Sequence, residues 1–318
     1  MATAVVDTLI IGGGPAGLSA AVALARHAHT AIILDSKAYR NAGVQHMHNV
    51  PGFDHASPAD FRGKVLQDLK QRYHSIEHIA ASINTLSKRE DGVFEAVDNR
   101  GKYYHGRKLI LATGVRDRLE DEVPGYAECW GKGVFHCLYC HGYEERGADS
   151  VGVLAGGQNT TPDMVMHVTK MAKRLAKKVT IYTHRSAEMV EPLRNRIHSS
   201  KISIDTRPVA SLSLVDRGPQ VEVTFEDGSS VVEGFIASHP KVEQHAEHLI
   251  RQLGLETTSG GEIQVQPPFN ATNNPGCFAV GDSATPFKSV LAAMQAGNFA
   301  GVGAASQLQS ELEERDLL

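Results

Sequence analysis

The feature that most constrains the fold is a glycine-rich turn near the start of the chain, between an apolar strand and a helix. Residues 7–11 have the composition of a buried strand, and residues 17–26 form an Ala- and Leu-rich helical segment. In such a turn the first glycine makes the bend, the second lets the backbone approach a pyrophosphate, and the third lets the helix pack on the strand. The residues that we expect to bind a dinucleotide here are Gly12, Gly14, Pro15, Ala16 and Gly17.

A second apolar segment, residues 30–34, leads into Asp35. An acidic side chain at the end of the second strand of such a unit accepts hydrogen bonds from the ribose hydroxyls of a bound dinucleotide. We therefore expect Asp35 to bind the cofactor. The alternative is that its carboxylate simply caps the end of the strand.

Two later segments indicate which dinucleotide is bound. Residues 272–282 combine a Pro-Gly turn, a short apolar strand and Gly281-Asp282 at its carboxyl end. They resemble a segment of flavoproteins with two dinucleotide sites, in which the aspartate binds the ribityl chain of FAD. Residues 109–114 are similar to the turn that ends the first flavin segment in that group, which places Thr113 near the cofactor. The expected cofactor is therefore FAD.

The chain also carries two cysteines two residues apart, Cys137 and Cys140, with His136 and His141 directly outside them. Such a pair can close a small, reducible disulfide ring, and a neighbouring imidazole can lower the pKa of a thiol or carry its proton. The same spacing is also half of a zinc site, but no second pair at a suitable spacing follows. The pattern favours redox chemistry over a metal site.

Composition argues against several other functions. A net charge of −4 and the lack of a basic tail argue against nucleic-acid binding, which needs clustered positive charge. No apolar run approaches the ~20 residues that cross a bilayer, and an early first strand leaves no room for a cleavable signal peptide. Cysteine usage favours a reducing compartment, so we expect a cytoplasmic protein in which Cys129 and Cys277 are buried.

In their order along nearly all 318 residues, these motifs resemble low-molecular-weight thioredoxin reductase. Residues 49–53 are similar to that family's flavin-side loop, and residues 130–134 to the approach to its redox cysteines. The resemblance implies an α/β homodimer with two Rossmann-like dinucleotide-binding domains. The implied domains are a discontinuous FAD-binding domain at 1–117 and 245–318 and an inserted NADPH-like domain, with the redox pair, at 118–244.

The chain departs from that family next to the redox cysteines. Thioredoxin reductases have an acidic residue directly after the second cysteine, whereas this chain has His141, which titrates nearer neutrality. The C-x-x-C-H pattern is similar to the fungal dithiol oxidases of epidithiodiketopiperazine biosynthesis, the gliotoxin oxidase type. This resemblance implies that a small-molecule dithiol is closed to a disulfide and that the electrons pass to O2, which gives H2O2. His141, and less directly His136, is then expected to accept thiol protons.

A second strand–helix–strand pattern is predicted at residues 150–155, 162–176 and 178–183. Its turn has Ala155 where the first glycine is expected, and Thr160 at the position where a small residue lets the helix pack on the strand. The added methyl groups hinder the close approach of the backbone to a pyrophosphate. The downstream basic patch of the family is reduced to one arginine. We expect NADPH binding to be impaired.

Several points stay open at this stage. The expected flavin contacts also include Asn49, Lys288 and Ser289, the last two standing where the family has an Arg-Gln pair. His46 and His48 either line a small-molecule pocket or are ordinary loop residues. The alternatives to a dithiol oxidase are an NADPH-dependent reductase of thioredoxin or a similar partner and a non-enzymatic flavin-bearing redox sensor.

Overall fold

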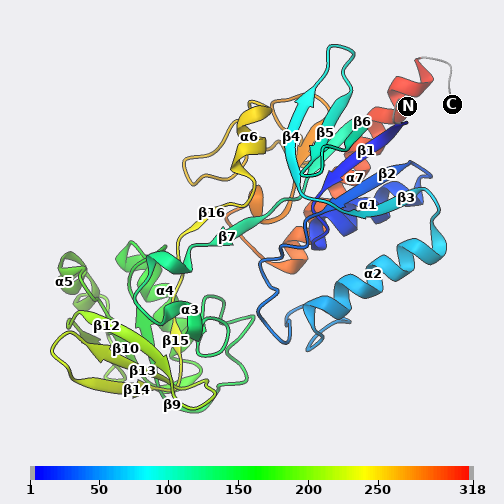
Figure 1. Cartoon of the computed structure of the whole chain (residues 1–318). Helices are drawn as coiled ribbons and strands as arrows, with labels where there is room; N and C mark the ends of the chain where they lie inside the picture. Colours follow the sequence, from blue (N-terminus) through cyan, green and yellow to red (C-terminus); the bar gives the residue numbers. More distant parts are fainter. Residues whose placement is uncertain (1–3, 315–318) are drawn as a thin grey trace. The chain divides into compact units, whose positions relative to one another are not determined.

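The computed structural model describes residues 4–314, which fold into two compact units (Figure 1). The first unit comprises Met1–Gln45, Val50–Arg116 and Glu243–Leu318, and the second comprises His46–Asn49 and Asp117–Val242. The first unit is therefore discontinuous in sequence. Two short strands, β7 (Val115–Asp117) and β16 (Val242–Gln244), pair with each other where the chain passes from one unit to the other.

The first unit is built on a seven-stranded sheet in which the order β3-β2-β1-β6-β5-β4 is extended by β17 pairing with β6. Strands β1, β2, β3, β6 and β17 run parallel, and β5 pairs antiparallel with both β6 and β4. Alternate residues of β1 face two different hydrophobic clusters, as expected for a sheet covered on both sides. The strands are β1 (Val5–Ile11), β2 (Ala31–Asp35), β3 (Ile76–Ala80), β4 (Ile83–Lys88), β5 (Phe94–Asp98), β6 (Tyr103–Leu111) and β17 (Cys277–Ala279).

Two helices of small residues cover one face of this sheet. Helix α1 begins at Pro15, earlier than the predicted start at residue 17, because proline fits the first turn of a helix without losing a hydrogen bond. Helix α7 begins after Ser289, whose hydroxyl accepts a hydrogen bond from the Ala292 amide. A Cβ added to Gly297 of α7 would overlap the carbonyl oxygen of Ala16, so the two helices pack at backbone distance. The helices of this unit are α1 (Pro15–Arg26), α2 (Pro58–Arg72), α6 (Glu247–Gln252), the 3-10 turn η3 (Gly281–Ser283) and α7 (Val290–Glu313).

The second unit has a five-stranded parallel sheet, ordered β11-β10-β9-β15-β8, and a three-stranded antiparallel sheet, β12-β13-β14. Alternate residues of β9 and β10 contact α4 or the β12-β14 sheet. The strands are β8 (Val134–Phe135), β9 (Ala148–Leu154), β10 (Ala176–Tyr182), β11 (Ile202–Asp205), β12 (Val209–Leu214), β13 (Val221–Phe225), β14 (Ser230–Glu233) and β15 (Ile236–Ala237). The helices are η1 (Leu119–Asp121), α3 (Tyr126–Cys129), α4 (Pro162–Ala172), η2 (Ala187–Met189) and α5 (Val190–Arg194).

This architecture confirms the predicted α/β fold with two Rossmann-like units, but one predicted helix was too long. Helix α4 ends at Ala172 rather than at residue 176. The amide of Leu175 bonds to the Ala172 carbonyl in a turn, and β10 already begins at Ala176. Lys173 and Arg174 therefore lie in the turn that leads into β10.

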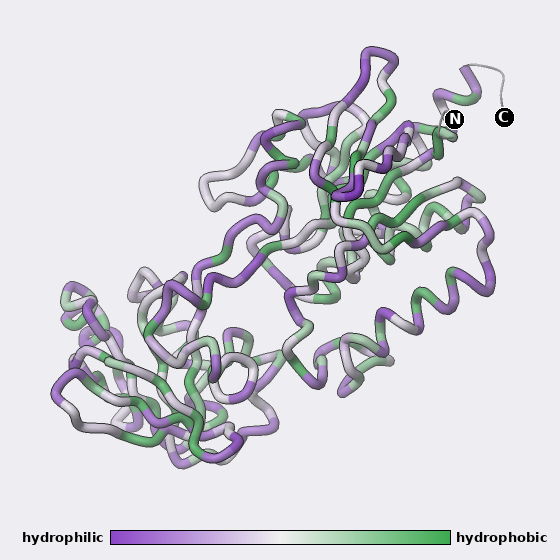
Figure 2. The backbone as a smooth tube through the Cα atoms, in the orientation of Figure 1, coloured by the Kyte–Doolittle hydropathy of each residue, from purple (hydrophilic) through white to green (hydrophobic). Residues whose placement is uncertain are grey.

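Hydrophobic residues gather along the central strands of both units, and polar residues follow the loops (Figure 2). The two unpaired cysteines, Cys129 and Cys277, are fully buried as predicted, and burial raises the pKa of Cys277 to about 12. Among the described residues, no helix has the length and apolar character needed to cross a membrane.

The close packing of α1 and α7 gives the first prediction. We expect Gly297→Ala to lower the free energy of unfolding by about 1–3 kcal/mol, because the added methyl group forces the two helix backbones apart. Gly63→Ala in α2 is the matched control, since a Cβ there meets no atom within 4 Å and the helix gains propensity. Urea unfolding of both variants measures the difference, and equal midpoints would contradict the packing argument.

Candidate active site

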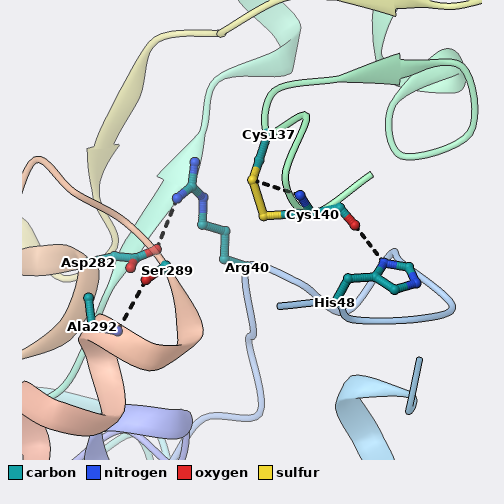
Figure 3. The surroundings of a disulfide bond; sticks show 7 residues. All are labelled: Arg40, His48, Cys137, Cys140, Asp282, Ser289 and Ala292. Carbon is teal, nitrogen blue, oxygen red and sulfur yellow. Dashed lines mark hydrogen bonds and ion pairs between the residues drawn. A yellow bond between two sulfur atoms is a disulfide. The ribbon is translucent and has the colours of Figure 1, made fainter. Parts of the chain in front are cut away.

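The C-x-x-C pair lies in the loop between β8 and β9 and is closed as a disulfide, Cys137–Cys140, with Cα atoms 5.2 Å apart (Figure 3). The loop is held as a tight turn, because the amides of Cys140 and His141 both donate to the carbonyl of Cys137, at 3.1 and 2.9 Å. Gly142 follows, and a Cβ there would press against the carbonyl oxygen of Leu138. The local backbone therefore requires a glycine directly after the C-x-x-C-H segment.

His141 lies beside the disulfide with its ring stacked on Phe135, at 5.6 Å between centroids and 12° between planes. Its Nε2 is buried and has no hydrogen-bond partner among the residues that the structure describes. Burial, and next the charge of His48, lowers the pKa of the His141 ring, partly offset by the backbone of His46 and by Glu144. A neutral imidazole with an unused nitrogen is suited to accept a proton.

His136, on the other side of the pair, is held by packing. Its ring stacks on Trp130 at 5.2 Å and meets the edge of His239 at 6.4 Å. Trp130 in turn stacks on the buried Tyr126. These contacts agree with a loop-packing role, and a part for His136 in proton transfer stays a prediction.

Two residues that the sequence reasoning did not assign also contact this loop. His48 places Nδ1 2.6 Å from the carbonyl oxygen of Cys140 (Figure 3) and Nε2 3.5 Å from the carboxylate of Glu144. His48 belongs to the short segment His46–Asn49, which groups with the second unit although the chain on either side belongs to the first. Glu144 lies four residues after Cys140, and its position in the C-x-x-C-H-G-Y-E run was the only signal in the sequence.

The predicted cofactor residues of the first unit meet at one edge of its sheet. Strands β1, β2, β6 and β17 are parallel, so their carboxyl ends, which lead to Gly12, Asp35, Thr113 and Gly281, lie at the same edge. Topology therefore brings together residues from four distant parts of the sequence. The exception is Asn49, which groups with the second unit.

The glycine turn of this unit fits a dinucleotide. A Cβ at Gly12 would overlap the Ala112 carbonyl, and one at Gly17 would overlap the carbonyl of Gly12, so both positions need glycine for packing. A Cβ at Gly14 would meet no atom within 4 Å, which leaves open space in front of the helix start. No side chain caps the N-terminus of α1, so its first amides remain for an anion.

Asp35 lies at the end of β2, as predicted, but is 2% exposed and already accepts three hydrogen bonds. Its Oδ2 accepts from Tyr39 at 2.6 Å and from His78 at 3.1 Å, and its Oδ1 accepts from the Lys37 amide at 2.9 Å. Burial alone would raise the pKa of this carboxyl, but these hydrogen bonds lower it overall. The Lys37 contact is the strand-end cap that the sequence left open, and ribose binding through the remaining lone pair of Oδ1 stays a prediction.

Near the other predicted flavin residues, Asp282 accepts from Arg40 at 3.0 Å (Figure 3), a partner that the sequence analysis missed. The hydroxyl of Thr113 is buried and has no partner within the described part of the chain, which fits a ligand contact. Lys288 bonds to the Thr285 carbonyl at 3.0 Å, and Ser289 caps α7. Direct contacts of these two side chains with flavin stay predictions.

The glycine turn of the second unit is built differently. The amides of Gly156 and Asn159 bond to each other's carbonyl oxygens, at 3.3 and 2.7 Å, and the Gln158 amide donates to the carbonyl of His239 at 2.7 Å. The Thr160 amide donates to the carbonyl of Gln158 at 2.9 Å. These four backbone donors, the groups that a pyrophosphate needs, are therefore used within the protein.

The start of α4 and the basic patch are occupied as well. Thr161 caps the helix by accepting from the Met164 amide at 3.3 Å. The guanidinium of Arg185, the remaining arginine of the patch, pairs with Glu226, and Nδ1 of His184 accepts from the Val209 amide at 2.9 Å. The cationic side chain that would meet a 2′-phosphate thus already has an anionic partner.

Several known proteins are similar to this chain. A family model described as pyridine nucleotide-disulphide oxidoreductase matches residues 6–297. The chain is 44% identical over 311 residues to thioredoxin reductase aclD of Aspergillus oryzae, covering 97% of this chain and 98% of that protein. It is 42% identical to thioredoxin reductase tcpT of Claviceps purpurea, covering 97% and 96%. Among solved structures, that of HlmI aligns with a TM-score of 0.88 at 27% identity, covering 99% of this chain and 97% of that one.

The open space at Gly14 gives the second prediction. We expect Gly14→Ala to leave the stability of the flavin-free protein unchanged but to weaken FAD binding about tenfold or more, because the methyl group stands where the pyrophosphate approaches. Titration of the flavin-free variant with FAD measures the affinity, and urea unfolding of the same sample measures the stability. Undiminished affinity would contradict the assignment of this turn to the pyrophosphate.

Proposed function

We propose that this chain is a dithiol oxidase. It belongs to the pyridine nucleotide-disulphide oxidoreductase family and is a thioredoxin-reductase-like flavoenzyme with FAD as its cofactor. Its substrate is a small-molecule dithiol of the epidithiodiketopiperazine kind, which leaves with an intramolecular disulfide. In this assignment the FAD-binding domain is 1–117 with 245–318, and the inserted domain is 118–244.

The main support for the proposal is the glycine turn of the second unit, in which several amides already bond within the protein. A reductase of this family takes its electrons from NADPH, which needs free amides at this turn and free cationic side chains beside it. Here the amides of Gly156, Gln158, Asn159 and Thr160 bond to backbone carbonyls, and Arg185 pairs with Glu226. We infer that electrons enter from a dithiol instead, through the Cys137–Cys140 disulfide.

The protein's own residues supply the thiol chemistry. A substrate thiolate attacks Cys137, the Cys137–Cys140 bond breaks, and Cys140 leaves as a thiolate. The second substrate thiolate then displaces Cys137 and closes the substrate disulfide, so that one dithiol is oxidised and one disulfide is reduced. The neutral ring of His141 accepts a proton from a substrate thiol at Nε2, which has no partner among the described residues.

Bound FAD supplies the two-electron acceptor that reoxidises the cysteine pair, and O2 is the final acceptor, which yields H2O2. Within the first unit, the turn from Gly12 to Gly17, Thr113 and Asp282 would hold the cofactor. The uncapped amides at the start of α1 would bind its pyrophosphate, and the carboxylate of Asp282, which pairs with Arg40, would accept from a hydroxyl.

Two aromatic side chains next to the disulfide support a small substrate. Tyr139 is 73% exposed and Tyr143 is 66% exposed, and they lie on either side of Cys140 in the sequence. The guanidinium of Arg146 covers one face of Tyr143, at 4.1 Å from the ring centroid. Exposed aromatic rings offer apolar surface for a flat, compact ring system such as a diketopiperazine.

The alternative function is an NADPH-dependent reductase of thioredoxin or a similar disulfide. It is favoured by the names of the relatives, which are called thioredoxin reductases, and by the complete strand–helix–strand unit that remains in the second unit. The two functions differ in which compound reduces the enzyme.

The third prediction separates these functions by anaerobic flavin absorbance. We expect a small dithiol to bleach the flavin rapidly, NADPH to bleach it slowly or not at all, and readmitted air to restore the absorbance with formation of H2O2. The physical reason is that the dithiol attacks the half-buried Cys137–Cys140 disulfide directly, whereas four amides of the second glycine turn already bond to carbonyls within the protein. Fast bleaching by NADPH would overturn the oxidase proposal in favour of the reductase.

Single cysteine variants serve as controls for this experiment. Cys137→Ser and Cys140→Ser should retain bound flavin and lose bleaching by dithiol, because neither can form the disulfide that accepts electrons. Cys129→Ala removes a buried thiol of the same unit and should bleach as the unmodified protein does. Normal oxidation by either serine variant would mean that the pair is not the electron acceptor.

The fourth prediction concerns pH. Burial, followed by the charge of His48, lowers the pKa of His141 from 6.5, and a lowered pKa keeps the ring neutral at more acidic pH. We therefore expect the rate of flavin reduction by dithiol to persist as pH falls through 6.5 and to decline only below it. His141→Gln should remove this acid limb and lower the rate about a hundredfold or more. Stopped-flow rates between about pH 5 and 8 measure the limb, and a midpoint above the ordinary histidine value would contradict the role of His141.

A further inference from the structure

We propose that His48 is a positioning residue of the redox loop, which tethers the carbonyl of Cys140 and, whenever its ring carries a proton, disfavours a second proton on His141. The part that concerns His141 rests on the proposed function, in which that ring is the proton acceptor. No motif in the sequence links His48 to the cysteine pair, and the juxtaposition comes from the fold alone.

The first element of the proposal is the contact with Cys140. Nδ1 of His48 lies 2.6 Å from the Cys140 carbonyl oxygen, and Figure 3 shows the ring aimed at that carbonyl. A carbonyl can only accept, so this nitrogen carries the proton and donates. The bond fixes the Cys140–His141 peptide, on which both the sulfur and the proposed base depend for their position.

The second element is the other ring nitrogen. Nε2 of His48 faces the carboxylate of Glu144 at 3.5 Å, another group that only accepts. Both ring nitrogens of His48 thus face groups that only accept. The side chain of His48 is 13% exposed and that of Glu144 is 39% exposed, so water screens the interactions of this pair only in part.

The third element is the neighbouring base. The rings of His48 and His141 meet edge to face, with centroids 6.0 Å apart. A positive charge at this distance disfavours a second positive charge on His141, and this effect is opposed by the carboxylate of Glu144 and the backbone of His46. Phe135, which covers the other face of His141, carries no charge. A proton on His48 therefore helps to keep His141 available as a proton acceptor.

The consequence is a division of labour between two neighbouring histidines. His141 has a buried Nε2 without a partner among the described residues, whereas both ring nitrogens of His48 face acceptors. His48 therefore acts through its neighbours, by positioning the loop and through the effect of its charge on the His141 ring.

Two substitutions separate the tether from the charge, which gives the fifth prediction. His48→Asn keeps a donor on the branch that carries Nδ1 but cannot take up a positive charge, whereas His48→Ala can neither donate nor become charged. We expect the pKa of His141 to rise in both variants, and the acid limb of dithiol-driven flavin reduction to move to higher pH with it. We expect the rate at its plateau to fall about ten- to a hundredfold in His48→Ala, through misplacement of the loop, and clearly less in His48→Asn.

Histidine NMR titration of the flavin-loaded, oxidised protein measures the pKa of His141, with the signal assigned by its loss in His141→Gln. This titration needs no substrate, so its result stands even if no dithiol is oxidised. A failure to oxidise dithiols would contradict the proposed function but would leave the effect of His48 on His141 intact. His198→Asn, an exposed histidine of the same unit, is the matched control and should change neither readout. An unchanged His141 titration in His48→Asn would overturn the charge effect, and a wild-type plateau rate in His48→Ala would overturn the tether.

Discussion

The parallel pairing of strands is the constraint on which both candidate sites depend. In the first unit, β1, β2, β6 and β17 end at one edge of the sheet, and in the second, β8, β9 and β15 do the same. Loops at such an edge are positioned by a buried sheet but are free to vary in sequence. The cofactor turn, the redox loop and the second glycine turn therefore share one structural origin and differ only in how each loop uses its polar groups.

The two glycine turns show how the hydrogen bonding of backbone amides decides whether such a turn can bind a phosphate. In the first unit the glycines are required by packing at Gly12 and Gly17, while the space at Gly14 is open and the start of α1 carries no side-chain cap. In the second unit the corresponding amides bond to carbonyls of the same loop or of His239. A buried or half-buried amide that already has a partner gains little from a phosphate, so the same supersecondary unit can keep its fold and lose its ligand.

Much of this molecule could be predicted from sequence because its signals are local. The strand–turn–helix at Gly12 to Gly17 and the C-x-x-C pair are read from adjacent residues, and the structure has them on the expected elements. The end of α4 was misplaced because helical composition continues past Ala172 into a turn whose hydrogen bonds depend on where β10 begins. The Arg40–Asp282 pair joins residues 242 positions apart, which no single sequence pattern encodes.

His48 is the clearest case of information that only the fold holds. Its segment lies among residues of the first unit in the sequence, yet it contacts the loop of the second unit that carries the disulfide. A histidine directly after the second cysteine is a weaker base than its identity suggests, because burial and a second imidazole both oppose its protonation. The histidine at position 141, where thioredoxin reductases have an acidic residue, therefore has to be considered together with His48 and Glu144. Both neighbours act on the pKa of its ring, which the charge of His48 lowers and that of Glu144 raises.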